Sequence, residues 1–225
     1  MTEEKVKGIV LKLSDYKEAD KLASVFTLEQ GIITCKFTSV KKEKAKLKAI
    51  AQPFVFAEFN LTKKMGLNQI INATLLDNFY PILSNYTKTI CGYIVLDILK
   101  TILPLNKPEP ELFLLTLNEL KEIESNNEYI ALINYILRFI EFSGMGLEFP
   151  ETDYVYLDKI NGDFSTSRTI NCLQLDKKVY ITLKQINNQE TDIQANENVL
   201  KQILRLLHNI IFIKFNEEIK SFDFI

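Results

Sequence analysis

The first third of the chain alternates apolar and polar positions with the two-residue period of β-strands. Such segments cover residues 5–13, 22–28, 32–40, 54–62 and 68–79. Turn signals separate them, among them Glu29-Gln30-Gly31 and Lys63-Lys64-Met65-Gly66. A flat open sheet would leave apolar edges exposed, whereas a small closed or nearly closed barrel would not. The pattern therefore predicts a five-stranded, partly open barrel of the OB type in residues 1–80.

After residue 80 the apolar positions recur at helical spacing. Helices are expected over residues 84–103, 109–125, 128–144 and 198–215. Prolines follow the first, and Gly144 and Gly146 end the third, as expected at helix C-termini. Residues 150–175 have no clear period and predict an irregular insert with a hairpin, while residues 176–188 fit either a strand or a short helix. The fold class is therefore α+β, with a mainly α-helical domain over residues 81–225.

Charge is distributed unevenly between these two parts. The formal net charge is only −2, which argues against a uniformly basic coat. Residues 1–80 carry 13 lysines against nine acidic residues, and the remainder carries 14 basic against 20 acidic residues. Such asymmetry indicates two modules with different partners.

The chain shows no sign of export. Its first residues lack a basic segment followed by an apolar run, and no apolar stretch reaches the ~20 residues that span a bilayer. Cys35, Cys91 and Cys172 are too scattered for a disulfide framework or a Cys-x-x-Cys site. We expect a cytoplasmic protein without a membrane partner.

Candidate catalytic residues are scarce. His208 is the single histidine and falls within the last predicted helix, where a packed or half-exposed residue is the simplest interpretation. No second histidine or nearby cysteine completes a metal set or a triad, and the glycine-rich phosphate loops are missing. The sequence therefore predicts a protein that is not an enzyme, with no catalytic residue, cofactor or metal.

Lysines gather in one segment between two predicted strands. The expected DNA-binding residues are this cluster, Lys36 just before it and two lysines in another turn: Lys36, Lys41, Lys42, Lys44, Lys46, Lys48, Lys63 and Lys64. Phosphate backbones attract such clusters through counterion release. Single strands also need stacking surfaces, for which the nearby candidates are Phe37, Phe54, Phe56 and Phe59. A solvated connector and core phenylalanines are the alternative interpretation.

Several motifs resemble the RecO family of recombination mediators. The N-terminal block carries the most specific of them, and the matches continue in order along nearly the whole chain. They are residues 7–12 (KGIVLK), 15–22 (DYKEADKL), 26–31 (FTLEQG), 52–54 (QPF), 108–113 (PEPELF), 139–150 and Lys220-Ser221.

The resemblance implies an OB-fold domain, a helical domain and a role in DNA repair and recombination. It further implies binding of single-stranded and double-stranded DNA, strand annealing, and work with RecR to load recombinase onto gaps coated with single-stranded DNA-binding protein (SSB). The C-terminal tail of SSB would dock on the helical domain, where Arg138 is the candidate for a peptide carboxylate. A nucleoid-associated location in the cytoplasm follows.

The chain departs from many relatives in one region. Where they carry four cysteines as a zinc module, residues 150–175 contain only Cys172, and one thiolate cannot form a tetrahedral site. We expect a zinc-free insert held by Tyr154, Tyr156, Ile160 and Phe164.

A rival function from another class remains open at this point. OB barrels bind proteins as well as nucleic acids, and a fold alone does not assign a function. A protein-interaction scaffold without direct DNA binding would suit the acidic second part of the chain.

Overall fold

The structure is a computed structural model that describes residues 3–64, 66–152 and 154–225. Met65, part of the predicted turn between the last two strands of the barrel, lies outside the described residues. The chain forms two compact units. The first consists of the residues up to 84 together with residues 96–118, and the second of residues 85–95 and 119–225.

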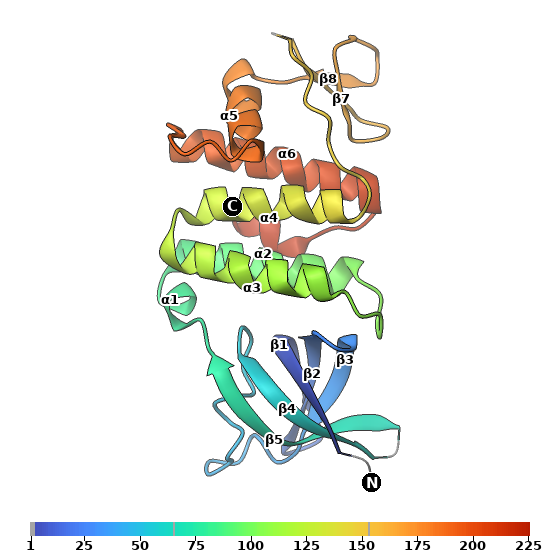
Figure 1. Cartoon of the computed structure of the whole chain (residues 1–225), viewed down its shortest axis with the longest axis vertical. Helices are drawn as coiled ribbons and strands as arrows, with labels where there is room; N and C mark the ends of the chain where they lie inside the picture. The colour runs from blue at the N-terminus through green and yellow to red at the C-terminus, as the bar shows by residue number, and fades with distance from the viewer. Residues whose placement is uncertain (1–2, 65, 153) are drawn as a thin grey trace. The chain divides into compact units, whose positions relative to one another are not determined.

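The first unit contains a closed five-stranded barrel, shown in blue to cyan-green in Figure 1. Its strands are β1 (Glu3–Tyr16), β2 (Asp20–Thr27), β3 (Gly31–Phe37), β4 (Phe56–Lys64) and β5 (Leu67–Asp77). They follow each other in the order β1-β2-β3-β5-β4, and β4 pairs back onto β1. The pair β3–β5 is parallel and the others are antiparallel. This arrangement confirms the predicted OB barrel and the α+β fold class.

Strand β1 closes the barrel because it is long enough to pair on both sides. It runs against β2 and β4, and an irregularity between Val10 and Lys12 lets one strand bend between its two partners. Gly8 lies in this strand, and a Cβ there would stand 2.6 Å from Cγ1 of Val25. A glycine at this position therefore permits the close approach of β1 and β2.

Gly31 begins β3 in the left-handed region, with φ +70°. A Cβ there would lie 1.9 Å from the backbone oxygen of Lys107, in the segment where Ile32 and Leu105 form an isolated β-bridge. The close approach of the Lys107 backbone and the positive φ of residue 31 both require a glycine at this position. This explains why the turn signal Glu29-Gln30-Gly31 ends in a glycine.

The interior of the barrel is filled by alternate side chains of the strands. Phe37 and Phe59 meet edge to face with centroids 6.3 Å apart, and both are almost fully buried. Phe26 contacts Phe113 in the same manner at 5.4 Å, so the first unit continues its core beyond the barrel. Aromatic pairs of this geometry stabilise a core beyond the area that they bury.

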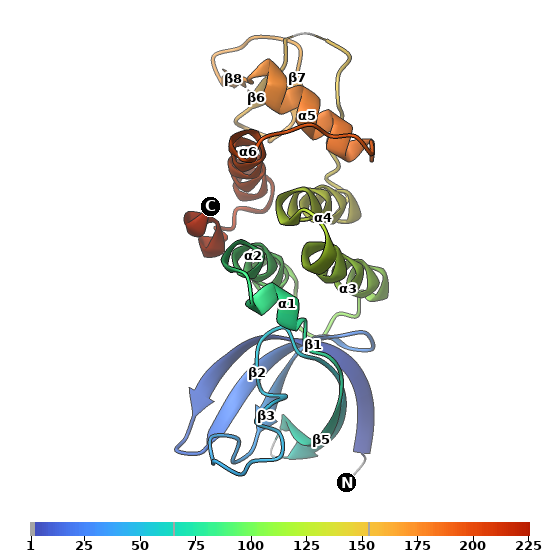
Figure 2. The same ribbon diagram turned by 90° about the vertical axis from the view of Figure 1, so that its left-hand side faces the viewer.

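The structure has a helix at each of the four places predicted from the apolar spacing, and it shows that the ambiguous residues 176–188 are mainly helical. They are α1 (Tyr80–Leu83), α2 (Tyr86–Ile102), α3 (Pro110–Ser125), α4 (Glu128–Phe142), α5 (Lys177–Asn187), α6 (Glu197–Phe215) and the short 3₁₀ helix η1 (Lys220–Phe224). In the second unit α4 packs against α6, and α5 against both (Figure 2). Asn127, Asp176 and Asn196 cap the N-termini of α4, α5 and α6 by accepting backbone N–H bonds.

The insert between α4 and α5 is a small three-stranded sheet. Its strands are β6 (Tyr156–Asp158), β7 (Phe164–Ser165) and β8 (Cys172–Gln174), in the order β7-β6-β8. The prediction of a hairpin here is confirmed, since β6 and β7 pair antiparallel.

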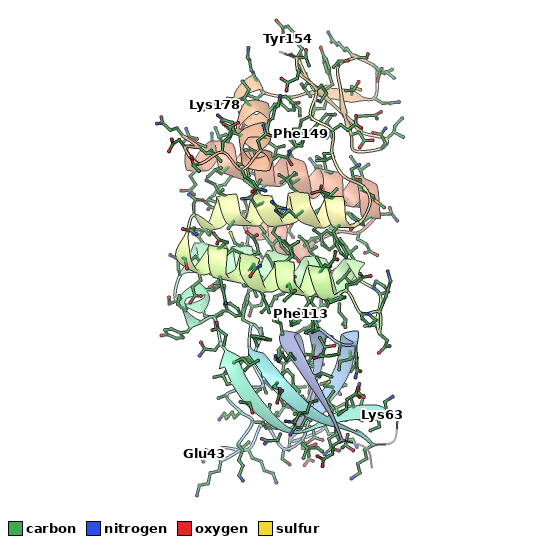
Figure 3. The ribbon with its side chains drawn as sticks, in the orientation of Figure 1. Glu43, Lys63, Phe113, Phe149, Tyr154 and Lys178 are labelled. Atoms are coloured by element: carbon green, nitrogen blue, oxygen red, sulfur yellow. The ribbon has the colours of Figure 1, made fainter. Side chains whose placement is uncertain are left out.

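The contacts that hold the insert differ from those expected. Phe164 is buried as predicted and meets Tyr180 of α5 edge to face at 5.5 Å. Tyr154 and Ile160, however, are 66% and 70% exposed, so their expected role is wrong; Figure 3 shows Tyr154 projecting from the end of the insert. Phe149 completes the aromatic cluster, at 5.2 Å from Phe164. Aromatic packing onto α5 therefore holds this segment.

The described residues contain neither a membrane-spanning helix nor a cluster of metal ligands. None of the described helices combines the length and the apolar character needed to cross a membrane. Among the same residues, no group of three or more His, Cys, Asp or Glu side chains is placed to hold a metal ion. Cys172 lies 3.1 Å from the Thr169 hydroxyl. The absence of zinc stays a prediction.

Candidate nucleic-acid interface

The lysine-rich segment between β3 and β4, residues 38–55, is called the lysine loop below. It is anchored to the barrel at both ends. Val40, Ile50 and Ala51 are buried in the barrel core, and Leu47 packs against that core from the middle of the loop. Backbone hydrogen bonds fold the segment into successive tight turns, from Ala45 N–H to the Lys42 carbonyl and from Lys48 N–H to the Ala45 carbonyl. The lysines are therefore displayed from a folded loop rather than from a simple extended connector.

The start of the loop is bound to the turn between β1 and β2. The Lys41 N–H donates to the Ala19 carbonyl at 3.0 Å, and the Ser39 N–H donates to the Asp20 carboxylate at 2.7 Å. The Lys41 ammonium pairs with the Asp15 carboxylate at 2.9 Å, and this hydrogen bond lowers the pKa of Asp15. The long-range pairing thus brings a second loop beside the lysine cluster.

Four lysines of the loop are exposed and, among the described residues, have no carboxylate within ion-pair distance. They are Lys42, Lys44, Lys46 and Lys48. Unpaired ammonium groups close together raise the local potential and attract a polyanion. Their charge is available for phosphates because no internal carboxylate has to be displaced first.

The other predicted DNA-binding lysines are placed differently. Lys36 is half-buried and lies 3.8 Å from the Asp20 carboxylate, so its charge is partly compensated within the barrel. Lys63 and Lys64 end β4 near Glu3 and Glu4. Figure 3 shows Lys63 on the opposite side of the lower end of the barrel from Glu43, which marks the lysine loop. The structure therefore brings together the lysines at 41–48 and separates those at 63–64.

The phenylalanines considered as stacking surfaces are mostly in the core. Phe37, Phe54 and Phe59 are at most 1% exposed, so these three cannot stack on a base from the surface. Phe56 is partly buried and meets Phe113 edge to face at 6.1 Å. The alternative interpretation of these residues, core packing, is the correct one.

The residues predicted from the sequence to contact DNA did not include Tyr16 and Lys17, which lie at the β1–β2 turn. Tyr16 is partly exposed, and the Lys17 ammonium lies 5.4 Å from its ring centroid. The Lys41–Asp15 ion pair places this turn next to the lysine loop. Asp15 and Lys41 are distant in sequence, so only the strand pairing could have shown that they belong to one surface.

The second unit carries a groove around Arg138, the residue predicted to take a peptide carboxylate. It consists of two hollows of about 330 and 390 Å³ that share Asn134, Arg138 and Gln189. Arg138 is exposed on α4. Leu137 and Leu147 line the first hollow, and Ile130 and Ile193 the second. The groove therefore combines the Arg138 cation and these apolar side chains with four glutamates, Glu141 in the first hollow and Glu119, Glu122 and Glu190 in the second.

A buried carboxyl group lies in the wall of this groove. Glu119 of α3 is 6% exposed, and its Oε1 has no hydrogen-bond partner within the described part of the chain. Burial, reinforced by the neighbouring Glu122 and opposed by Arg138, raises the pKa of Glu119 to about 8. At neutral pH this carboxyl is mainly protonated, so the groove has less negative charge than its residues suggest.

His208 is a partly buried residue of α6 in the second unit. Its ring stacks on Phe222 with centroids 4.4 Å apart, and burial lowers its pKa. This agrees with the simplest interpretation of the sequence, a packed or half-exposed helix residue.

Comparison with known families covers both parts of the chain. Residues 1–79 match the family described as "Recombination protein O N terminal", and residues 83–220 match "Recombination protein O C terminal". The chain belongs to the RecO family. The resemblance found in the motifs of the first 54 residues is thereby confirmed.

Curated relatives of this RecO-family chain carry the name "DNA repair protein RecO". That from Caldicellulosiruptor saccharolyticus is 26% identical over 87% of this chain and 78% of its own length. That from Clostridium perfringens is 23% identical over 96% and 94%, and that from Bacillus subtilis 28% identical over 72% and 64%. RecO-family membership indicates a role in DNA repair.

Proposed function

We propose that this RecO-family chain is a DNA repair and recombination mediator that binds single-stranded and double-stranded DNA and anneals complementary strands. It acts with RecR to load recombinase onto gaps coated with SSB, and it does so without catalysing a chemical reaction. The observation that carries the proposal is the cluster of exposed, unpaired lysines on the folded loop of the OB barrel, at Lys42, Lys44, Lys46 and Lys48.

The barrel holds DNA by its phosphates and reads no base sequence. The binding residues are those of the lysine loop and its neighbours: Lys36, Lys41, Lys42, Lys44, Lys46, Lys48, Lys63 and Lys64. Ammonium groups on flexible stems are suited to phosphate contact, and each contact releases counterions into solution. A phosphate would compete with Asp15 for Lys41, whose ion pair lies at the surface and is therefore weak.

Annealing needs no chemical step in this account. Two DNA strands repel each other, and a basic surface that holds both lowers the repulsion and raises their local concentration. We expect the full chain to accelerate the annealing of two complementary oligonucleotides by about tenfold or more at low salt. A fluorescence-quenching assay measures the rate, with a non-complementary pair as the control. Equal rates with and without protein would remove annealing from the proposal.

The Arg138 groove is the proposed site for the C-terminal tail of SSB. A peptide carboxylate would form a charge-assisted hydrogen bond with the Arg138 guanidinium, and apolar side chains would contact Leu137 and Leu147. Protonation of Glu119 at neutral pH lowers the negative charge that an anionic ligand meets beside Arg138, whereas the other glutamates of the groove, Glu122, Glu141 and Glu190, oppose such a ligand.

Replacing Arg138 by Ala is expected to weaken binding of a synthetic SSB-tail peptide by roughly tenfold, because a charge-assisted contact is lost. The matched control is Arg205→Ala, which removes an exposed arginine from α6 of the same unit. Calorimetric titration of the full chain measures both. If Arg138→Ala and Arg205→Ala bind the peptide as tightly as the wild type, the tail docks elsewhere.

A further inference from the structure

An apolar hollow opens beside the exposed lysines. It has a volume of about 320 Å³ and is lined by Thr38, Ser39, Lys42, Lys44, Ala45, Lys46, Leu47 and Ile71. Volumes of this size are at the lower end of those that bind small molecules, about 300–1,000 Å³. The hollow is thus large enough for a compact planar ring.

The floor of the hollow comes from two separate elements. Leu47 projects from the middle of the lysine loop and packs partly on the barrel core. Ile71 lies on β5, directly after Ile70, which pairs with Phe37 at the end of β3. The loop leaves β3 at that point, so the parallel β3–β5 pairing brings the loop and β5 together.

Ile71 is an unusual residue for an exposed strand position. It is 48% exposed, although its neighbour Ile70 is buried in the barrel core. An isolated exposed apolar side chain needs no explanation, but this one shares a hollow with Leu47, Ala45 and three ammonium-bearing side chains. The apolar floor formed by Leu47 and Ile71 and the cationic rim formed by the three lysines together fit a ligand that has a flat apolar part between two anionic groups.

We propose that this hollow holds one unstacked base of a single DNA strand. The base contacts Leu47 and Ile71, and the phosphates on either side of it contact Lys42, Lys44 and Lys46. Single strands expose bases that a duplex keeps stacked, so such a site favours single-stranded over double-stranded DNA. The base contact comes from this aliphatic floor, because Phe37, Phe54 and Phe59 are buried in the core and cannot reach a bound base.

The inference rests on the proposed DNA binding and adds a base-dependent component to it. The test compares a labelled single-stranded oligonucleotide with one of equal length in which every base is replaced by an abasic tetrahydrofuran unit. The wild type should bind the abasic strand about fivefold more weakly, which is no more than the lower limit for a base stacked on an aromatic ring, because the floor of this hollow is aliphatic. The phosphates of the two strands are the same, so their salt dependence should agree.

Ile71→Thr keeps a β-branched residue in the strand and removes apolar surface. We expect it to lower affinity for the normal strand while leaving affinity for the abasic strand unchanged. Ile71→Phe supplies an aromatic floor and should increase the difference between the two strands. The matched control, Leu75→Thr, changes another exposed apolar residue of β5, 45% exposed and outside the hollow, and should behave as the wild type.

The outcomes separate this inference from the proposed function. Equal binding of normal and abasic strands by the wild type, with strong salt dependence for both, would overturn the base site and leave phosphate binding intact. An equal loss of affinity for both strands in Ile71→Thr would also overturn it. Failure of the wild type to bind either strand at low salt would contradict DNA binding itself.

Discussion

Replacing Lys41, Lys42, Lys44 and Lys46 together by Ala should lower the affinity for single-stranded DNA on the order of 100-fold at low salt. Each lost phosphate contact removes about 0.7 from the slope of log affinity against log salt concentration, so the slope should flatten by up to about 3. These side chains are on the surface, and the loop is anchored by buried apolar residues such as Val40 and Ile50. The barrel should therefore remain folded in the variant.

The control for this variant has to match its change in net charge. Lys121, Lys159, Lys178 and Lys220 are exposed lysines of the second unit, and their joint replacement by Ala also removes four positive charges. If the loop is the binding site, this control keeps most of the affinity and the slope. Equal losses in the two quadruple variants would mean that overall charge, and no particular surface, governs binding.

The second large effect concerns folding stability and the buried Glu119. Its pKa is near 4.5 in the unfolded chain and about 8 in the folded one. Between these values the folded state retains a proton that the unfolded state has lost. The free energy of unfolding therefore decreases as pH rises from about 4.5 through 8, by on the order of 5 kcal/mol in total from this group.

Glu119→Gln keeps the shape of the side chain and removes its titration. We expect the variant to exceed the wild type in stability by on the order of 4–5 kcal/mol at pH 9, and to differ little near pH 4.5. Urea denaturation at pH 5, 7 and 9 measures the difference. Glu111→Gln is the control, because Glu111 is an exposed glutamate of the same helix whose charge does not contribute to the raised pKa of Glu119; it should change stability by less than about 1 kcal/mol at every pH. A Glu119→Gln effect that is constant with pH would refute the raised pKa.

The helices and strands were predictable from the sequence because each has a strong local signal. The two-residue alternation located the five barrel strands, and the apolar spacing located α2, α3, α4 and α6. The ambiguous residues 176–188 include α5, and its start is marked by Asp176, whose carboxylate accepts from the N–H groups of Lys178 and Val179. That capping residue was a signal that the period alone did not reveal.

The direction in which a side chain points, into the core or toward solvent, was harder to predict than the secondary structure. Alternation places Phe37 on one face of β3 and Phe59 on one face of β4, but it does not say which face of each strand points into the barrel. The same difficulty affected Tyr154 and Ile160, which are exposed in the insert while Phe149 and Phe164 form its contact with α5. In these cases the sequence identified apolar residues without showing what covers them.

The candidate sites depend on contacts between residues far apart in sequence. The hollow beside the lysine loop needs the β3–β5 pairing, which brings Ile71 to Leu47. Glu119, by contrast, had a readable signal. It lies seven residues after Leu112 and four before Ile123, on the buried stripe of α3, where a carboxyl group stands out among apolar side chains.

The central claim is that the barrel of this RecO-family chain binds DNA by its phosphates, and a salt titration tests it most directly. Fluorescence anisotropy of a labelled single-stranded oligonucleotide is measured with the full wild-type chain from about 50 to 300 mM salt, the range over which phosphate contacts weaken. We predict tight binding at low salt and a linear fall of log affinity with a slope of about −3 or steeper. Absence of binding at the lowest salt concentration would contradict the account and favour a protein-interaction scaffold.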